Sequence, residues 1–463
     1  MVLMKKVDVL IIGAATIGSY FARRMAEKGL EVLVIDALSS EKIGTKYDIF
    51  HINERDFEKF KLPKPVEGDA DWGFSFSDST AYSAFGKHPK PGKSTVIGMH
   101  LHDYTLRLNR WAEEAGAEIE YDAAFKELLF SEKGAVCGAK YLKNGEEIEV
   151  AACLVADCSG IPSVARRKLP DTSLVENFEI SPEEMFYVTL RYVNYDNEAD
   201  YIKASRSWTF YKTWEAPQHD PTGAILGIGA NFSFDFAEKI YSNFEGTVYL
   251  PPYKLHHIER GATPYRRPPY SFVDDGFIVM GDAACLTKPS AGEGVTSSMV
   301  QADIAVDVAA PLLLEKRDIC AANLWPINKR YIEVQGKAFA AQLAMLVGAV
   351  ATSAKENDFF FEKDIIFSSK SFAALGDGQE LSFTGKELTD IAAKMAAGVA
   401  AGRLRPKTIA SLLKAMNNSG KISKLYSEYP ASPGGFAEWK KKADALWPQC
   451  GSMAEHAAEM LGV

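Results

Sequence analysis

The stretch that decides the fold is VDVLIIGAATIG, at residues 7–18. Residues 7–12 are apolar at every position but one, which is typical of a strand buried on both faces of a sheet. A helical pattern follows over residues 16–28, and residues 32–35 form a second apolar run that closes at Asp36. The order of strand, glycine-bearing turn, helix and strand predicts a βαβ unit with two parallel strands.

The turn between the first strand and the helix reads GAATIG, which departs from the dinucleotide-binding pattern GxGxxG only at Ala15. Gly13 permits the tight turn, the small Ala15 lets the backbone approach a pyrophosphate, and Gly18 lets the helix pack closely on the strand. The N–H groups at the start of the helix would hold the phosphates, and Asp36 would accept from ribose hydroxyls. The predicted nucleotide-binding residues of this unit are Gly13, Ala15, Thr16, Ile17, Gly18, Asp36 and Ala37.

Two later segments favour a flavin-binding chain over a plain nicotinamide dehydrogenase, which could contain the same unit. One is DCSGIPS, at residues 157–163; the other is GFIVMGDAA, at residues 276–284, continued by PSAGEG at residues 289–294. At these segments the sequence resembles the FAD-dependent geranylgeranyl reductase family and, more broadly, the flavoproteins similar to para-hydroxybenzoate hydroxylase. The resemblance covers residues 7–310 in motif order and implies non-covalent FAD as the cofactor.

The resemblance also implies cofactor roles for individual residues. Asp282 would bond the ribityl chain, and the P-x-x-G-x-G turn would start a helix whose N-terminus faces the flavin pyrimidine. A helix N-terminus stabilises the negative charge that a reduced flavin carries, so this placement is physically sensible. The family's K-x-C-G loop beside the flavin is matched at Lys46. The cofactor-binding residues implied in this way are Lys46, Asp157, Ser159, Gly160, Gly281, Asp282, Pro289, Gly292, Gly294 and Val295.

Buried strands in three separated places, a β-rich region between them and helical patterns from residue 324 onward indicate the fold class. We expect an α/β protein with a Rossmann-like, glutathione-reductase-like FAD-binding domain (three layers, ββα), an interleaved antiparallel β-sheet substrate domain and a helical C-terminal domain. The expected segments are 1–66, 100–172 and 263–322 for the FAD-binding domain, 67–99 and 173–262 for the substrate domain, and 323–463 for the helical domain.

Aromatic residues indicate an apolar, isoprenoid-like substrate. In the resembled family a Y-x-W-x-F-P stretch, followed by a glycine-bearing strand, lines the substrate cavity. The stretch SWTFY at residues 207–211, followed by LGIG at residues 226–229, matches this arrangement in part. Trp208, Phe210 and Tyr211 are therefore predicted substrate contacts, with the alternative that these side chains are ordinary aromatics of a sheet core.

The candidate proton donors lie just after Lys46. Asp48 stands where the family carries its cysteine, and His51 follows three residues later. Both are predicted catalytic residues, although Asp48 would need a pKa raised by burial to donate a proton near neutrality. The alternatives are a turn or capping aspartate and a histidine without a catalytic role. His100 and His102 stand near the place of an arginine that the family often carries before its next helix.

Three functions remain open at this point. The first is an FAD-dependent reductase that delivers hydride from flavin N5 to a carbon–carbon double bond, with electrons from NAD(P)H or a ferredoxin-like protein. The second is a monooxygenase that uses NAD(P)H and O2, because residues 157–163 resemble the NADPH-binding region of that group. The third is a flavin-binding module without turnover, such as an electron-transfer partner or a sensor.

The composition of the chain limits the classes of partner and of reaction that are expected. The formal net charge of −9 disfavours nucleic acid, and six scattered cysteines without a CxxC pair disfavour a thiol–disulfide enzyme. No metal site is predicted. The apolar run near the N-terminus fits a strand better than a signal peptide, so a cytoplasmic location is expected. Residues 338–354 are predicted to form a buried helix, and contact with a membrane surface is the less favoured alternative.

Overall fold

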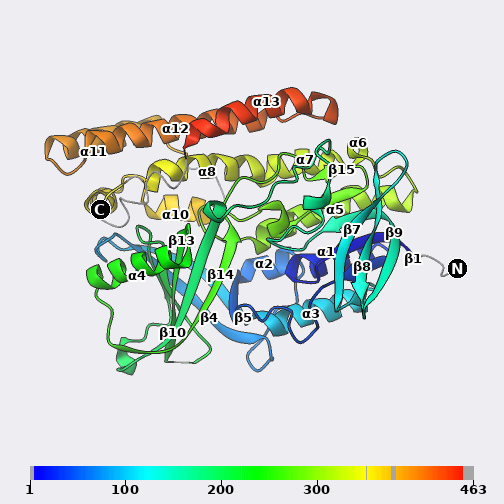
Figure 1. Ribbon diagram of the computed structural model, residues 1–463. Coiled ribbons are helices and arrows are strands. Elements are labelled where there is room, and N and C mark those ends of the chain that lie inside the picture. Colours follow the sequence, from blue (N-terminus) through cyan, green and yellow to red (C-terminus); the bar gives the residue numbers. More distant parts are fainter. Residues whose placement is uncertain (1–4, 221, 351, 377–381, 452–463) are drawn as a thin grey trace.

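The computed structural model describes residues 5–220, 222–350, 352–376 and 382–451. The chain forms two large sheets, surrounded by helices, with the C-terminal helices in a row along one side (Figure 1). The predicted α/β class, with an interleaved sheet domain and a helical C-terminal region, is confirmed.

The first sheet is built on the predicted βαβ unit. β1 (Lys5–Ile12) pairs in parallel with β2 (Val32–Ile35) on one side and with β9 (Glu146–Asp157) on the other, and α1 (Thr16–Ala26) connects β1 to β2. All four residues of β2 are buried, because elements cover both faces of the sheet. The parallel core continues through the outer strands β6 (Glu118–Glu120) and β16 (Phe277–Val279).

Further elements complete the layers of this domain. The strands β7 (Ala123–Phe130) and β8 (Val136–Lys143) form an antiparallel meander with β9, and β15 (Val273–Asp274) pairs with β16 at the far edge. The helices α1, α3 (Leu101–Glu114) and α5 (Val295–Leu314) pack together, and their buried residues belong to the same core as those of the parallel strands.

The second sheet follows the order β14-β10-β13-β12-β11-β4-β5-β3 and is antiparallel except between β11 and β4. It includes residues 49–53, expected within the first FAD-binding segment, because β3 pairs there with β5 in antiparallel register, Ile49 opposite His100. The helix α4 (Phe234–Thr247) packs on one face of this sheet. The strands are β3 (Ile49–Asn53), β4 (Trp72–Tyr82), β5 (Lys90–His100), β10 (Met185–Tyr195), β11 (Ser205–Trp208), β12 (Thr213–Pro217), β13 (Gly223–Asn231) and β14 (Tyr253–Pro264).

The chain after α5 is helical, as expected. Figure 1 shows α11, α12 and α13 as an outer row above α8, and α8 packs along α12. Within the described residues, only α5 is long and apolar enough to cross a membrane, and 67% of that window is buried inside the protein. The predicted helix over residues 338–354 is largely α8, although residue 351 lies outside the described part. The helices are α2 (Glu54–Lys59), α6 (Ala321–Leu324), α7 (Pro326–Tyr331), α8 (Lys337–Val350), α9 (Ala354–Glu362), α10 (Ser369–Gly376), α11 (Gly385–Ala400), α12 (Pro406–Ser427) and α13 (Phe436–Leu446).

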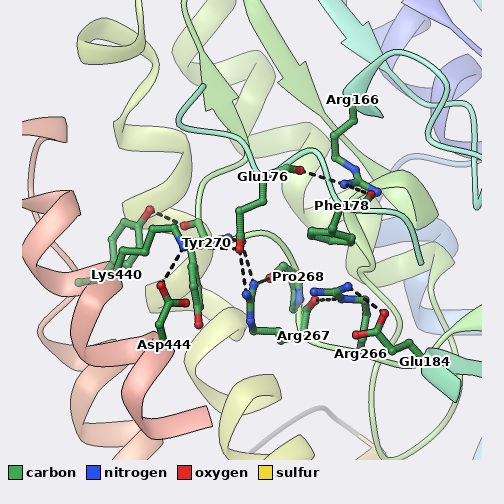
Figure 2. Close-up of polar contacts among 11 residues, drawn as sticks. Arg166, Glu176, Phe178, Glu184, Arg266, Arg267, Pro268, Tyr270, Lys440 and Asp444 are labelled. Carbon is green, nitrogen blue, oxygen red and sulfur yellow. Dashed lines mark hydrogen bonds and ion pairs between the residues drawn. The ribbon is translucent and has the colours of Figure 1, made fainter. Parts of the chain in front are cut away.

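A cluster of charged and aromatic residues lies where α13 meets the rest of the chain (Figure 2). Arg267 donates to both carboxylate oxygens of Glu176, at 2.8 and 2.9 Å, and the Nζ of Lys440 on α13 lies 3.8 Å from the same carboxylate. The guanidinium groups of Arg166 and Arg266 lie 4.0 and 3.4 Å from the ring centre of Phe178. Such bidentate and cation–π contacts hold planar groups in one orientation.

Candidate functional site

A cavity of about 630 Å³ opens at the carboxyl ends of β1, β2 and β9. Ligands of open α/β sheets bind at this edge. The segments that the sequence singled out for the cofactor are far apart along the chain, yet each contributes residues to this one cavity. The predicted cofactor-binding residues that line it are Gly13, Ala15, Thr16, Ile17, Asp36, Ala37, Lys46, Ser159, Gly160, Gly281, Asp282, Gly294 and Val295.

Two glycines shape the turn at the bottom of the cavity. Gly13 has a φ of +108°, and a Cβ added there would lie 2.4 Å from the carbonyl oxygen of Cys158. A Cβ at Gly18 would lie 1.8 Å from the carbonyl oxygen of Gly13, so Gly18 supports the turn from behind. The helix α1 begins after Ala15, and no side chain caps it. Its first N–H groups are therefore available to a pyrophosphate.

Hydrogen bonds from two backbone N–H groups hold the side chain of Asp36 in place at the end of β2. Its Oδ2 accepts from the N–H of Ala14 at 2.7 Å, and its Oδ1 accepts from the N–H of Leu38 at 2.8 Å. A carboxylate can accept about four hydrogen bonds. The two that Asp36 accepts from backbone N–H groups therefore leave it able to accept from ribose hydroxyls as well. The carboxylate is thus held in place before any ligand arrives.

Asp157 organises the second predicted segment and is fully buried. Its carboxylate accepts from the backbone N–H groups of Ser159, Ala165 and Arg166, at 3.0, 3.1 and 2.7 Å. Asp157 therefore positions the loop, whereas Ser159 and Gly160 of that loop line the cavity.

The third segment places the acid Asp282 next to the start of the helix α5. Burial raises the pKa of Asp282 to about 6, and the positive charge of Lys46 opposes this rise. The helix α5 begins after Gly294, and the carboxylate of Glu293 accepts from the N–H of Thr296 in its first turn at 2.6 Å. A Cβ at Gly294 would lie 3.2 Å from Oδ1 of Asp282. Gly292 has a φ of +69°, and the carbonyl of Pro289 accepts from the hydroxyl of Tyr265 at 3.0 Å, which anchors the turn.

These residues fit FAD. The start of α1, which no side chain caps, suits the pyrophosphate, and Asp36 suits a ribose. Asp282 and Gly294 both line the cavity, and a side chain at residue 294 would meet the carboxylate of Asp282. The cavity volume lies in the usual range for ligand sites.

The predicted substrate aromatics lie on the α4 side of the second sheet. Trp208 and Tyr211 are each 3% exposed and belong to the core between the sheet and α4, and the ring of Trp208 lies 4.9 Å from that of Phe244. Phe210 packs against the same core. Of the two interpretations, the structure favours ordinary core aromatics over substrate contacts.

Trp214 is a second candidate for the tryptophan of the substrate motif. It pairs with Ser207 across β11 and β12, so it points to the face opposite Trp208. A Cβ at Gly227 would lie 2.1 Å from the indole ring of Trp214. Trp214 packs in the same hydrophobic cluster as Tyr47, the neighbour of Lys46. The signal was present in the sequence: Trp214 and Pro217 keep the W-x-F-P spacing, six residues after the stretch first matched.

Alanine substitutions should separate the two tryptophans. Trp208→Ala is expected to lower the free energy of unfolding by about 3–5 kcal/mol, the usual cost of emptying a buried aromatic site. Trp214→Ala is expected to cost less stability but to raise the KM for an isoprenoid lipid about tenfold, as lost apolar contact dictates. Unfolding in urea measures the free energy of unfolding, and steady-state kinetics measure the KM. A reversed pattern would show that the substrate occupies the α4 side.

Asp48 forms a charged pair with a histidine. Its Oδ1 lies 2.7 Å from Nδ1 of His100, and its Oδ2 lies 4.0 Å from Nδ1 of His219. The hydrogen bond from His100 lowers the pKa of Asp48, and the same bond raises the pKa of His100. A protonated Asp48, which a carboxyl donor requires, is therefore disfavoured. Of the two groups, His100 is the one whose protonated form the pair favours.

His51 lies deeper in the same region. Its ring centre lies 5.4 Å from that of Phe74 and 6.2 Å from that of Phe76, and its buried Nε2 has no hydrogen-bond partner within the described residues. Burial lowers the pKa of His51 to about 4. His51 is therefore neutral near neutrality and suits an apolar wall better than a proton donor.

Comparisons with known proteins support this arrangement. No family model matches the chain. The digeranylgeranylglycerophospholipid reductase of Sulfolobus acidocaldarius is 26% identical over 461 residues, which span 95% of this chain and 97% of that protein. The crystal structure of a geranylgeranyl bacteriochlorophyll reductase-like protein from Thermoplasma acidophilum has a TM-score of 0.66 and 19% identity, over 86% of this chain and 98% of that one.

The fold is shared more widely. The p-nitrophenol 4-monooxygenase PnpA of Pseudomonas putida has a TM-score of 0.55 with 13% identity, over 89% of this chain and 99% of that one. The structural matches show the fold, and the sequence match extends through the C-terminal helices, beyond the motifs from which the resemblance was drawn. The predicted resemblance to the geranylgeranyl reductases is confirmed.

Proposed function

We propose that this chain, which resembles the geranylgeranyl reductases over nearly its whole length, is an FAD-dependent oxidoreductase that saturates carbon–carbon double bonds of an isoprenoid lipid. The observation that carries the proposal is the convergence of three separate motifs on one cavity that fits FAD, beside the face of the second sheet that holds Trp214. The whole-length similarity to a reductase of isoprenoid lipids supplies the substrate class.

Bound FAD would supply the hydride that adds to one carbon of the double bond. The chain's own residues would hold the cofactor. The backbone at the start of α1 would bind its phosphates. The N-terminal end of α5 would face the negative charge of the reduced cofactor. Lys46 and Asp282 would form the wall between these ends of the cavity.

His100 would supply the proton that the second carbon requires. Its hydrogen bond to Asp48 raises its pKa and so favours its protonated form, and it ends β5, next to the loop that carries Lys46. The same loop packs against the start of α3: a Cβ at Gly44, which lines the cavity, would lie 2.9 Å from the Cα of His102. The proton-bearing pair therefore lies beside the cofactor cavity.

The electron donor is NAD(P)H or a ferredoxin-like protein, and anaerobic reduction separates the two. A flavin spectrum that bleaches within seconds of adding NADPH supports the nicotinamide donor. A spectrum that stays oxidised with NADPH but bleaches with dithionite supports the protein donor.

Oxygen uptake tests the proposed reaction against the monooxygenase alternative. With a geranylgeranylated lipid and a reductant in air, lipid saturation is expected without lipid-stimulated oxygen consumption, because no oxygen atom enters the product. An oxygen electrode and mass spectrometry of the lipid measure the two quantities. Oxygen uptake that rises with lipid, accompanied by a hydroxylated product, would reject the reductase function.

A further inference from the structure

Lys212, in the turn between β11 and β12, points its charged end into the protein. The residue is half-buried, yet its Nζ is buried and has no hydrogen-bond partner among the residues that the structure describes. Lysine normally does the reverse, with its stem against the protein and its ammonium group in water. A buried amine without an acceptor destabilises the folded chain, so its presence indicates a role other than stability.

The backbone at Lys212 is strained as well. Its φ of +49° lies in the left-handed region, which residues other than glycine rarely adopt. The carbonyl of Lys212 accepts from the N–H of Gly229 at 3.0 Å, which holds the bend against β13. Strained backbone of this kind is found at functional sites, where the surrounding structure fixes it. Two unfavourable features therefore meet at one residue.

Lys212 also marks a departure from the resembled family. Counted back from Trp214 and Pro217, it stands where the motif Y-x-W-x-F-P has its tyrosine. A phenol is thereby replaced by an amine that can carry a positive charge. The charged group is a property of this chain and not of the motif.

The amine lies on the face of the second sheet that holds Trp214. Its Nζ lies 4.8 Å from the ring centre of Phe186 and 5.0 Å from that of Tyr265. A Cβ at Gly229 would meet the ring of Phe186. A Cβ at Gly227, which faces the same side of β13, would meet the ring of Trp214. Two aromatic rings therefore hold the amine on the face of the sheet to which the proposed function assigns the reaction.

These two rings form a layer behind the cofactor cavity. Phe186 lies opposite Thr263 in the antiparallel pair of β10 and β14, and Thr263 lines the cavity. The hydroxyl of Thr263 lies 2.7 Å from that of Thr287. The hydroxyl of Tyr265 donates to the carbonyl of Pro289 at 3.0 Å. Both contacts reach the segment that leads into α5, so the amine lies one layer behind the cavity wall at the end where α5 begins.

The charge of Lys212 differs from that of the other lysines near the cavity. Lys288 lies 3.4 Å from the carboxylate of Glu293, and the charge of Lys46 acts on the carboxylate of Asp282. Burial lowers the pKa of Lys212 to about 7, and no carboxylate contributes to this shift. A negative charge brought near such an amine favours its protonated form. Because linkage is reciprocal, the ammonium group in turn favours the negative charge.

We propose that Lys212 is a positioning residue for the redox chemistry of the site: its ammonium group, behind the cavity wall, stabilises the negative charge of reduced FAD and so raises the reduction potential of the bound cofactor. The effect is electrostatic and acts through the layer that contains Phe186 and Tyr265, where water does not screen it. It rests on the binding of FAD and not on the identity of the substrate.

The reduction potential of the FAD-loaded protein, measured without oxygen against a reference dye of known potential, tests this role without turnover. Lys212→Met removes the amine and keeps the length of the side chain. At a fixed dye potential, the ratio of reduced to oxidised flavin is expected to fall about tenfold, which is about 30 mV for a two-electron couple. Lys212→Arg keeps the charge and should keep the ratio. Lys254→Met, at an exposed position on β14, is the matched control and should leave the ratio unchanged.

Lys212→Met should not lower the Tm, because an apolar chain replaces a buried amine that has no acceptor. Lys212→Gln, polar but uncharged, is measured beside it and should show the same fall in the ratio. An unchanged ratio in these two variants, or an equal fall in Lys212→Arg, would overturn the proposal. If the ratio falls as expected but the unaltered protein leaves the double bonds of an isoprenoid lipid intact, the proposed function is contradicted and this role of Lys212 is kept.

Discussion

Gly13→Val is expected to yield a protein that retains no FAD through gel filtration. A side chain at this position meets the carbonyl oxygen of Cys158 at 2.4 Å from its Cβ, and the φ of +108° is strained for any residue but glycine. The ends of β1 and β9 would have to separate, which displaces the turn that holds the pyrophosphate. We expect a loss of FAD affinity of at least about a hundredfold, which corresponds to roughly 3 kcal/mol.

The ratio of flavin to protein absorbance measures this loss, and a thermal melt followed by circular dichroism shows whether the chain still folds. Gly246→Val is the matched control, because Gly246 is exposed on α4 and a Cβ there meets no atom within 4 Å. It should keep a full complement of FAD. Stoichiometric FAD in the folded Gly13→Val protein would contradict the site.

His100→Gln is expected to lower the rate of lipid saturation about 100- to 1000-fold, since glutamine cannot carry the proton. Reduction of the flavin by dithionite should proceed as in the unaltered protein, because His100 contacts Asp48 and not the predicted FAD-binding turn. Stopped-flow oxidation of the reduced flavin by lipid measures the step directly. His256→Gln, an exposed histidine on β14, serves as the control. An unchanged oxidation rate in His100→Gln would remove His100 from the reaction.

The pH profile gives an independent test of the same pair. The hydrogen bond to Asp48 raises the pKa of His100, so the protonated donor is present below that pKa and is lost as the pH rises through it. Asp48→Asn removes the negative partner and lowers the pKa of His100. The fall of the rate is then expected at a lower pH than in the unaltered protein. If the rate of the Asp48→Asn variant falls at the same pH as that of the unaltered protein, a group other than His100 controls the pH profile.

The nucleotide unit could be predicted because its signal is local. The apolar run, the turn and Asp36 lie within thirty residues, and each has a steric or hydrogen-bonding reason that needs no distant partner. Asp157 shows the limit of this reasoning: the motif located the right loop, but its side chain turned inward to hold the backbone of Arg166. Whether a motif residue points at a ligand or supports the loop depends on packing that sequence does not reveal.

The substrate face could not be assigned from the sequence because a strand alternates its side chains between two faces. Trp208 and Trp214 are both aromatic strand residues, and a shift of the match by six residues changed the face assigned to the motif. The proposed donor, His100, was not among the predicted catalytic residues for a different reason. Asp48 and His100 are 52 residues apart, and only the pairing of β3 with β5 brings them within a hydrogen bond.

The most direct test of the central claim is anaerobic mixing of the dithionite-reduced, FAD-loaded protein with a geranylgeranylated phospholipid. The flavin absorbance and the mass of the lipid are followed together. The proposed function requires the oxidised flavin spectrum to return while the lipid gains one pair of hydrogens for each bond saturated. A flavin that stays reduced beside unchanged lipid, and is reoxidised only when oxygen is admitted, would contradict it.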